Sequence, residues 1–357
     1  MKRTVLITGG AGFVGSNLAV LFKEKSAGCE VIALDNLKRR GSELNLPRLK
    51  DAGVVFIHGD IRCPEDLALD GKKPDTVIEC SAEPSVLAGV KSSARYLVNT
   101  NLAGTANCLE AARLWGSDVI FLSTSRVYPV EKLNSLKFDE GETRFTLTDG
   151  QGITGASSQG ISKEFPLEGY RSLYGATKLS SEHLLEEYSA MYGLRSVVNR
   201  CGVIAGPWQM GKVDQGVFVH WLGSHYFKKD LCYIGYGGKG FQVRDLLHIE
   251  DLFELVLWQV ENIGKVAGRV FNVGGGRHTS LSLCETTLLC SQITGNSVKI
   301  TPVLKDRELD VRIYMTDLAD VTGATLWSPK ISSRDILVDI YGWIRSNEAQ
   351  IKQVLFS

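Results

Sequence analysis

The run Val5-Leu-Ile-Thr-Gly-Gly-Ala-Gly-Phe-Val-Gly-Ser16 decides the fold class of this chain. The residues from Thr4 to Thr8 are mostly apolar and β-branched, which is typical of a short buried strand. Three glycines follow with the spacing G-x-x-G-x-x-G, and Phe13–Lys23 has the apolar spacing of a helix. Glycines allow a tight turn, and a helix N-terminus favours an anion, so this order predicts a pyrophosphate-binding loop. The predicted contacts are Gly9, Gly12, Phe13, Val14 and Gly15.

A second strand, Glu30–Leu34, ends at Asp35, twenty residues after Gly15. A carboxylate at this point accepts hydrogen bonds from a ribose diol and repels a 2′-phosphate, which favours NAD over NADP. The basic run Lys38-Arg-Arg40 follows closely and leaves two interpretations open, a contact to a 2′-phosphate or a solvated loop. We expect NAD, with Asp35 and Asn36 among its contacts.

Apolar strands alternate with helical stretches through the first half of the chain. The strand candidates are Val54–His58, Thr76–Cys80 and Val119–Ser123, and Leu97–Leu114 is predicted to be a helix. This rhythm predicts an α/β fold with a Rossmann-type, doubly wound parallel sheet, in which ligands lie beyond the carboxyl ends of the strands. Further cofactor contacts are therefore expected just after two strands, at Asp60, Ile61, Ser81 and Ala82.

Residues 1–200 are predicted to form the NAD-binding Rossmann domain. Residues 201–357 are predicted to be mainly a smaller substrate-binding lobe, from which about 240–275 return to the Rossmann domain. The stretch 129–166 is rich in Gly, Ser, Thr and Glu and is predicted to be a long loop. Its role as a lid over the substrate is a hypothesis.

Composition excludes several classes of protein. The 357 residues carry 40 basic and 40 acidic side chains, so the formal net charge is zero. No basic tract favours nucleic acid or an anionic membrane surface, and no apolar run approaches the ~18 residues that span a bilayer. The eight cysteines include no C-x-x-C pair, and the six histidines form no metal-binding pattern. We expect a cytoplasmic protein without a metal.

Tyr174 and Lys178 are the candidate acid/base residues. They are four residues apart in a predicted helix, so their side chains lie on one face, about one turn from each other. A phenol ordinarily loses its proton near pH 10, and a neighbouring ammonium lowers the pKa toward neutrality. A hydroxyl at the end of the strand Val119–Ser123 is expected to point into the same cleft.

Taken together, these motifs make the chain resemble the extended short-chain dehydrogenase/reductase family. The matching segments are Gly9–Gly15, Asp35, Asp60-Ile61, Ser123–Tyr128, Tyr174/Lys178, Gly206-Pro207, Val243–Asp251 and Phe271–Gly275. The resemblance implies nucleotide-sugar chemistry on a tightly held NAD. It also implies that Tyr174 transfers the proton, that Lys178 lowers the Tyr174 pKa and binds the nicotinamide ribose, and that Thr124, four residues before Tyr128, hydrogen-bonds the reacting oxygen.

One departure from the family narrows the predicted reaction. Sugar 4,6-dehydratases of this family carry an Asp-Glu pair after the catalytic Thr, where this chain has Ser125-Arg126, so 4,6-dehydration is not expected. The segments Ser81–Gly89, Asn199–Lys212 and Arg171–Lys178 are most similar to the branch that epimerises CDP-paratose (CDP-tyvelose) at C2. A UDP-hexose 4-epimerase is the alternative. A dehydratase or decarboxylase and a non-catalytic NAD-binding regulator are less favoured.

The resemblance also implies substrate contacts and a homodimer. The expected substrate contacts are Glu83, Thr124, Ser125, Arg126, Asn199, Arg244 and Arg307. The two later arginines are candidates for the nucleotide diphosphate, because a guanidinium matches phosphate geometry with two hydrogen bonds. The homodimer would pair the helices near Leu97–Leu114 and Leu179–Tyr192.

Overall fold

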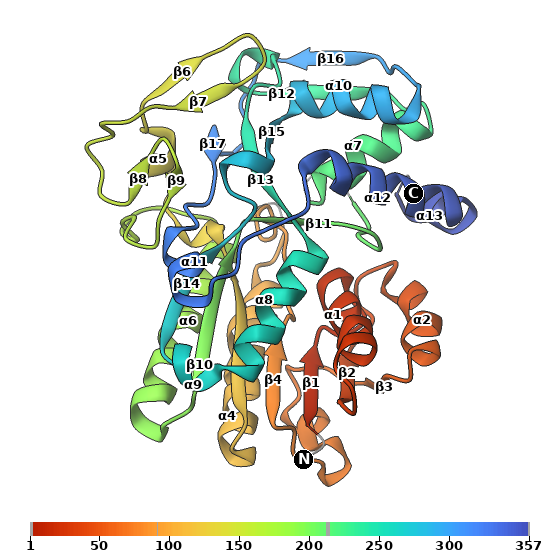
Figure 1. Ribbon diagram of the computed structural model, residues 1–357, viewed down its shortest axis with the longest axis vertical. Helices are drawn as coiled ribbons and strands as arrows, with labels where there is room; N and C mark the ends of the chain where they lie inside the picture. Colours follow the sequence, from red (N-terminus) through yellow and green to blue (C-terminus); the bar gives the residue numbers. More distant parts are fainter. Residues whose placement is uncertain (1–2, 91, 212–214, 356–357) are drawn as a thin grey trace. The chain divides into compact units, whose positions relative to one another are not determined.

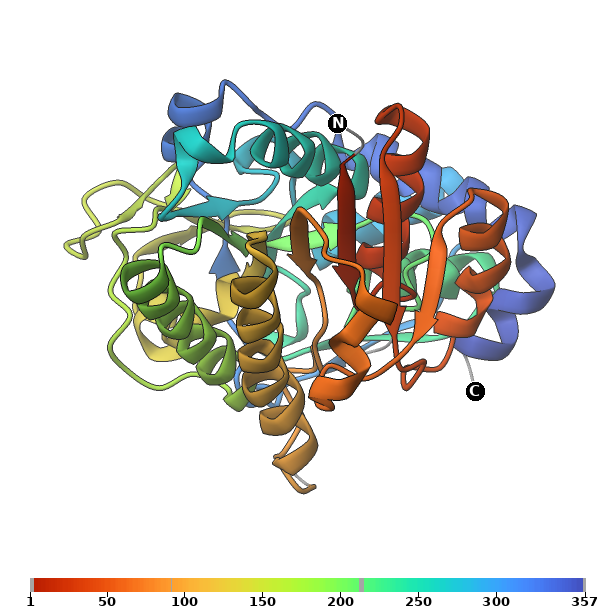
Figure 2. The ribbon, with the colours of Figure 1, turned by 90° about the horizontal axis from the view of Figure 1, so that it is seen from below.

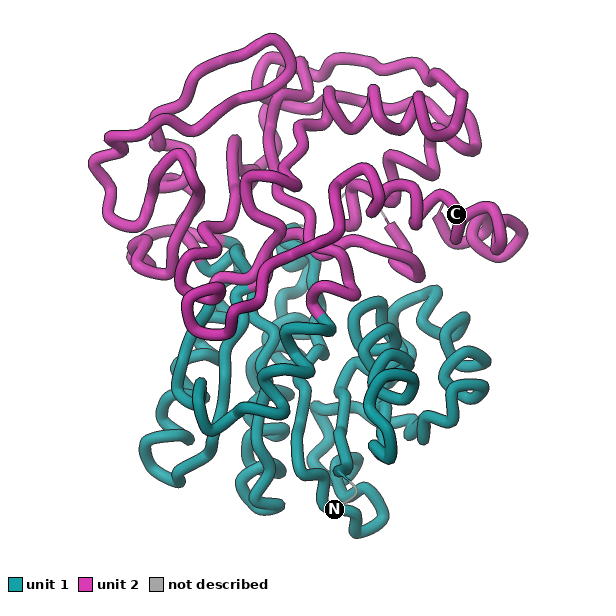
Figure 3. Tube along the Cα trace, viewed as in Figure 1, with its two compact units in different colours: residues 1–127, 172–200, 253–271 teal, residues 128–171, 201–252, 272–357 magenta. Residues whose placement is uncertain are grey.

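The computed structural model describes residues 3–90, 92–211 and 215–355, so Lys212 lies outside the described residues. The chain divides into two compact units, which Figure 3 shows in different colours. Unit 1 is made of Met1–Val127, Ser172–Arg200 and Phe253–Phe271. Unit 2 is made of Tyr128–Arg171, Cys201–Leu252 and Asn272–Ser357.

This division differs from the boundary that the sequence predicts at residue 200. Tyr128–Arg171 belongs to unit 2, and the stretch that returns to unit 1 is Phe253–Phe271 rather than residues 240–275. The first difference has a physical cause, because backbone hydrogen bonds tie the early segment to later residues of unit 2. The amide of Phe145, for example, donates to the carbonyl of Phe241 at 3.1 Å.

Unit 1 contains a seven-stranded sheet with the order β14-β10-β5-β4-β1-β2-β3 (Figure 1). The pairs β1/β2, β1/β4, β2/β3 and β4/β5 are parallel. The strands are β1 Thr4–Thr8, β2 Glu30–Asp35, β3 Val55–His58, β4 Thr76–Glu79, β5 Asp118–Thr124, β10 Ser196–Cys201 and β14 Arg269–Val273. The predicted doubly wound parallel sheet is thus confirmed.

Helices cover both faces of this sheet in Figures 1 and 2. They are α1 Phe13–Lys25, α2 Leu46–Asp51, α3 Arg95–Val98, α4 Thr105–Trp115, α6 Leu173–Tyr192, α8 Ile249–Glu261 and α9 Ile263–Val266. Short 3₁₀ turns are η1 Ser42–Asn45, η2 Pro64–Gly71 and η4 Ser125–Val127. The predicted helix Leu97–Leu114 is present, but a π-helical segment, η3 Asn99–Gly104, separates α3 from α4.

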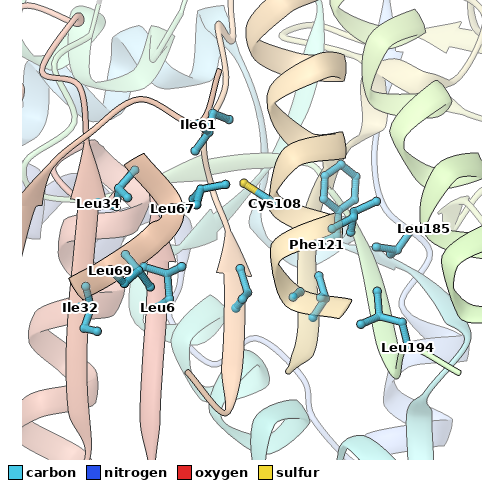
Figure 4. Close-up of a cluster of buried hydrophobic side chains, with 14 of the residues drawn as sticks. Leu6, Ile32, Leu34, Ile61, Leu67, Leu69, Cys108, Phe121, Leu185 and Leu194 are labelled. Carbon is cyan, nitrogen blue, oxygen red and sulfur yellow. The ribbon is translucent and has the colours of Figure 1, made fainter. Parts of the chain in front are cut away.

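Alternate side chains of the strands build two apolar layers, because successive residues of a strand point to opposite faces. One layer, drawn in Figure 4, joins strand residues such as Leu6 and Phe121 to Cys108 of α4 and Leu185 of α6. The other layer holds α1 and α8, where the rings of Phe22 and Phe253 meet edge to face with centroids 5.1 Å apart. Burial of this kind, roughly 25 cal/mol per Å² of apolar surface, is what stabilises unit 1.

Unit 2 is built from smaller sheets. Its strands are β6 Phe138–Glu140, β7 Phe145–Leu147, β8 Ala156–Ser157, β9 Gly160–Ile161, β11 Val203–Ala205, β12 Leu231–Ile234, β13 Val243–His248, β15 Ser280–Ser282, β16 Ile300–Val303 and β17 Ile313–Tyr314. Its helices are α5 Val130–Asn134, α7 Val217–Tyr226, α10 Leu283–Thr294, α11 Ala319–Thr325, α12 Ser333–Ser346 and α13 Glu348–Leu355, with 3₁₀ turns η5 Tyr236–Gly238 and η6 Arg277–Thr279. The central strand is β13, which pairs with β11, β15 and β17.

The stretch 129–166 is not the structureless loop that its composition predicts. It contains α5 and two small hairpins, β6/β7 and β8/β9. Arg312, far away in sequence, contacts both α5 and the first hairpin: its guanidinium donates to the carbonyl of Asn134, the last residue of α5, at 3.0 Å and lies 4.4 Å from the ring centroid of Phe138 in β6. The segment is therefore an integral part of unit 2.

Within the described residues, no helix is long and apolar enough to cross a membrane. The same residues contain no group of three or more His, Cys, Asp and Glu side chains that could hold a metal ion.

Candidate active site

The glycine run forms a tight turn between β1 and α1. A Cβ at Gly15 would lie 2.2 Å from the carbonyl oxygen of Gly9, and a Cβ at Gly10 would lie 2.6 Å from the Cβ of Ala33. Only glycine fits either position, so Gly10 is a fourth loop glycine that the spacing did not single out. Gly12 caps α1 without a side-chain hydrogen bond, and the first turn of the helix has no acidic residue. The helix N-terminus therefore suits an anion such as a pyrophosphate.

The acids at the ends of β2 and β3 are held in fixed positions. Asp35 accepts hydrogen bonds from the amides of Ala11 at 3.1 Å and Leu37 at 2.7 Å. Burial raises the pKa of Asp35, and these backbone amides act in the opposite direction. Asn36 donates to Asp60 at 2.9 Å, which joins two of the predicted cofactor contacts directly.

Asp60 is ionised over the whole working pH range of an enzyme. Its ion pair with Arg62, 2.6 Å between Nη2 and Oδ2, lowers the pKa of Asp60 to about 2, with the Arg62 hydrogen bond as the main cause. The guanidinium of Arg62 lies 4.8 Å from the ring centroid of Tyr96, and the ammonium of Lys38 lies 5.8 Å from the same ring. Lys38 and Arg62 thus both lie against the ring of Tyr96.

The carboxyl end of β4 is close to the glycine loop. A Cβ at Gly9 would lie 3.0 Å from the backbone of Cys80 and Ser81, so Ser81, a predicted cofactor contact, lies against the loop. Two residues on, the backbone of Glu83 is clamped by Asn101, whose amide accepts from Glu83 N at 2.7 Å and donates to Glu83 O at 3.1 Å.

Asn101 is a functional candidate that sequence reasoning missed. It belongs to the π-helical segment η3, is 0% exposed, and also donates to Thr177 Oγ1 on α6 at 3.3 Å. π-helical segments occur frequently at functional sites.

Of the other predicted cofactor contacts, Ile61 is buried, and its carbonyl accepts a hydrogen bond from the side chain of Asn107 at 2.8 Å.

Helix α6 begins immediately before Tyr174. Ser172 is the N-cap, and its hydroxyl accepts from the amide of Gly175 at 3.1 Å. Tyr174 therefore lies in the first turn, where the positive end of the helix dipole favours a phenolate. Lys178 follows one turn later on the same face, as the spacing predicts.

Lys178 has a partner that the sequence analysis did not identify. Its Nζ lies 3.3 Å from Oε2 of Glu79, the last residue of β4, and 4.2 Å from the ring centroid of Phe121. The two charged side chains are 2% and 1% exposed. Burial raises the pKa of Glu79, while Lys178 and the amide of Ser81 act in the opposite direction. The only sequence signal was an acid at the end of an apolar strand.

A second buried ion pair lies one turn beyond Lys178. Glu182 accepts from Arg200 of β10, with Nη2 2.7 Å from Oε2, and it also accepts from the hydroxyl of Ser123 of β5. Breaking a buried pair of this kind costs about 3–5 kcal/mol, since it leaves one charge without a counterion. This pair fixes α6 against β5 and β10.

Thr124 is the last residue of β5, and it is followed by the 3₁₀ turn η4, which contains Ser125 and Arg126. Its Oγ1 accepts from the amide of Arg126 at 3.2 Å. Helix α6 packs against both β5 and η4. The structure thus places Thr124 and the Tyr174–Lys178 pair on neighbouring elements of unit 1.

Two predicted substrate contacts, Asn199 and Arg244, are already engaged by other residues of the protein. Asn199 is 0% exposed, and its amide exchanges two hydrogen bonds of 2.8 Å with Gln259, so it is a packing residue of unit 1. In unit 2, Arg244 pairs with Asp310 at 2.9 Å and donates to two backbone carbonyls. Arg307 is partly exposed, and its role stays a prediction.

Comparison with known proteins identifies the family to which the chain belongs. Residues 5–274 match the model of the NAD-dependent epimerase/dehydratase family. This chain belongs to that family. The resemblance seen in the sequence is therefore confirmed, and the dependence on NAD with it.

Individual proteins of known function resemble the chain over nearly its full length. A CDP-paratose 2-epimerase of Salmonella typhi is 34% identical over 355 residues, which cover 96% of this chain and 99% of that protein. A dTDP-glucose 4,6-dehydratase of Streptomyces niveus is 28% identical over 353 residues, 97% and 94% of the two chains. The solved UDP-glucose 4-epimerase of Thermotoga maritima, with UDP-glucose, has a TM-score of 0.76 at 26% identity and covers 97% of this chain and 100% of that chain.

Proposed function

We propose that this protein is an epimerase that inverts C2 of a CDP-hexose such as CDP-paratose through a transient keto-sugar. The observation that carries the proposal is the 34% identity to a CDP-paratose 2-epimerase over nearly the whole of both chains. The chain also has the residues that the chemistry needs, with Tyr174 and Lys178 on one face of α6 and Thr124 at the end of β5.

The cofactor site fits NAD. The cradle at Gly9–Gly15, which a Cβ would fill, and the uncapped N-terminus of α1 suit the pyrophosphate. Asp35, at the end of β2, suits the adenosine ribose, and Ser81 and Ala82 lie just after the end of β4. NAD bound here supplies a hydride acceptor that gives the same hydride back, so the reaction needs no external oxidant.

The residues of the chain perform the proton transfer. Tyr174 takes the proton of the sugar hydroxyl as the carbon is oxidised, and Lys178 and the α6 dipole stabilise its phenolate. Thr124 donates a hydrogen bond to the reacting oxygen. The keto-sugar then reorients in the site. Tyr174 returns the proton to the oxygen while the hydride returns to the opposite face of the carbon.

Substrate selection is assigned to residues near η4 and in unit 2. Ser125 and Arg126 stand where a 4,6-dehydratase has acids, so elimination of water has no acid/base pair here. Arg307 is the candidate for the nucleotide diphosphate, and Arg244 is retained as a second candidate although it is already paired with Asp310. Glu83 remains a candidate substrate contact next to the cofactor.

The alternative function is a UDP-hexose 4-epimerase, which the likeness to the Thermotoga maritima enzyme supports. The same residues would serve this reaction, because the two reactions differ only in the sugar carbon that faces the nicotinamide and in the nucleotide base of the substrate, cytosine or uracil. A non-catalytic NAD-binding regulator is disfavoured, because a sensor has no need of Thr124, Tyr174 and Lys178.

The test is incubation with CDP-paratose, CDP-tyvelose and UDP-galactose in deuterated water, followed by product NMR. We expect interconversion of the two CDP-sugars, with protium kept at C2, because the hydride never exchanges with solvent. Turnover of UDP-galactose alone would instead establish the alternative. Deuterium at C2 from the start of the reaction would contradict hydride return.

We also propose a homodimer that pairs the surfaces of α4 and α6. Large apolar side chains are exposed at the ends of both helices, with Leu114 64% and Met191 68% exposed. Light scattering after size exclusion is expected to give twice the chain mass, and Met191→Glu to shift it toward the monomer. Leu326→Glu, at an exposed site in unit 2, is the control. A wild-type monomer at micromolar concentration would contradict the dimer.

A cytoplasmic location is proposed as well, because Cys29, Cys63, Cys108, Cys232, Cys284 and Cys290 are free thiols in the structure. Recovery of the protein in an exported fraction after cell fractionation would contradict it.

A further inference from the structure

Glu79 is a buried acid for which the reaction outlined above has no role. It ends β4, is 1% exposed, and contacts the ammonium of Lys178 through Oε2 at 3.3 Å. Its other oxygen, Oε1, is buried and has no hydrogen-bond partner within the described part of the chain. A carboxylate oxygen in this state is unusual, because nearly all buried polar atoms are paired.

This arrangement is costly to the fold. Typical charge-assisted hydrogen bonds are about 2.7–2.9 Å long, so the contact with Lys178 is a loose one. An apolar side chain of similar volume in place of a buried ion pair is often neutral or stabilising. The acid is therefore better explained by its charge than by its packing.

The elements α3, α4, β5 and η4 pack against α6, and their charged side chains are Arg95, Glu110, Arg113, Asp118 and Arg126. On α6, Glu182 is already satisfied by Arg200 of β10, so it does not compete for the ammonium. On α4, burial raises the pKa of Cys108 well above its usual value, so the thiol is neutral. Strand β1, next to β4, has no titratable side chain, and Val119–Thr124 of β5 has none either. The charge that acts on Lys178 from the side of the sheet is thus that of Glu79.

A reversible reaction makes this charge useful. Tyr174 must be a base when the sugar is oxidised and an acid when it is reduced, which works best when its pKa is near the working pH. An uncompensated buried ammonium, together with the α6 dipole, would hold the phenolate too firmly for it to take up a proton. A carboxylate on the far side of the ammonium weakens the electrostatic stabilisation of the phenolate.

We propose that Glu79 is a positioning residue, which holds the Lys178 ammonium, offsets part of its charge at Tyr174, and so sets the pH range in which Tyr174 exchanges its proton. This inference rests on the proposed function, in which Tyr174 is the acid/base.

The experiment is a tyrosinate absorbance titration of the NAD-loaded protein, which needs no substrate. The chain has 11 tyrosines, so the curve of a Tyr174→Phe variant is subtracted to isolate Tyr174. Glu79→Gln, which keeps the size and removes the charge, is expected to lower the Tyr174 midpoint by about one pH unit, the order expected for a unit charge beyond the ammonium at an effective dielectric of about 20. In the pH profile of kcat/KM, the midpoint of the acid limb is likewise expected to move to lower pH.

Three further variants complete the test. Glu79→Met removes the charge in a form that suits an apolar core and gives the same expectation if Glu79→Gln does not fold. Glu79→Asp keeps the charge and is expected to restore the wild-type midpoint. Asp118→Asn removes a carboxylate that pairs with Arg195 at the opposite end of the neighbouring strand and is expected to shift nothing.

The outcomes separate the inference from the proposed function. If the titration shows no low-pH component that Tyr174→Phe removes, Tyr174 is not the acid/base, and the proposed function and the inference both fail. If that component is present but Glu79→Gln or Glu79→Met leaves its midpoint unchanged or raises it, the inference alone is refuted.

Discussion

Tyr174→Phe is expected to lower kcat by roughly 10²- to 10⁴-fold, the range that a positioned acid/base contributes. The change removes one hydroxyl from the first turn of α6 and leaves the ring in place, so the loss falls on kcat rather than on substrate binding. KM and the amount of bound NAD should change little. Initial rates at saturating CDP-paratose, with NAD released by heat and quantified, provide the measurement.

The control for this prediction lies on the same helix. Tyr188 is also on α6, and its hydroxyl donates to Glu110 at 3.3 Å, away from Lys178. Tyr188→Phe removes the same atom from the same element and should leave kcat within about twofold, as is usual for surface changes. If Tyr174→Phe retained wild-type turnover, proton transfer would have to be reassigned to another group.

Gly15→Ala is expected to weaken NAD binding by about 10- to 100-fold, or to prevent it. The added Cβ would lie 2.2 Å from the carbonyl oxygen of Gly9, which is part of the turn itself. Overpacking of this kind costs about 1–3 kcal/mol, and each 1.4 kcal/mol is a tenfold change in affinity. The strain falls on the loop that would hold the pyrophosphate. Calorimetric titration of the NAD-free protein, alongside its thermal unfolding, would measure both effects.

Gly264→Ala is the matched control for the loop variant. Gly264 lies in α9 of the same unit, and a Cβ there would meet no atom within 4 Å apart from its chain neighbours and the backbone of its own helix. Alanine is favoured over glycine inside a helix, so NAD binding should be unchanged. Equal affinities of the two alanine variants for NAD would show that the glycine loop does not hold the cofactor.

Local patterns were enough to predict the parts of the fold that local geometry determines. The β1–α1–β2 segment follows from glycine spacing and strand periodicity, because the turn and the helix start within a few residues of each other. The Tyr174–Lys178 face likewise depends only on helical spacing. Both were found where the sequence predicted them.

The features that were missed depend on partners far away in the chain. Lys178 meets Glu79 across 99 positions, and Arg244 meets Asp310 across 66, so no spacing rule connects them. The stretch 129–166 has a loop composition, yet Phe241 and Arg312 hold its short strands in place. Tertiary contacts decide such weak strands, because β propensity depends strongly on context.

The path of the chain through the two units constrains how the protein can fold during synthesis. The polypeptide passes from one unit to the other after residues 127, 171, 200, 252 and 271. A ribosome that has released only the first 200 residues has not yet made Phe253, which covers Phe22, or β14, which covers the edge of β10. The unfinished sheet exposes that edge and an apolar face, the features that promote aggregation. Folding of unit 1 must therefore wait until residue 271 has been translated, when about half of unit 2 has also been made, and neither unit can be produced by a single truncation.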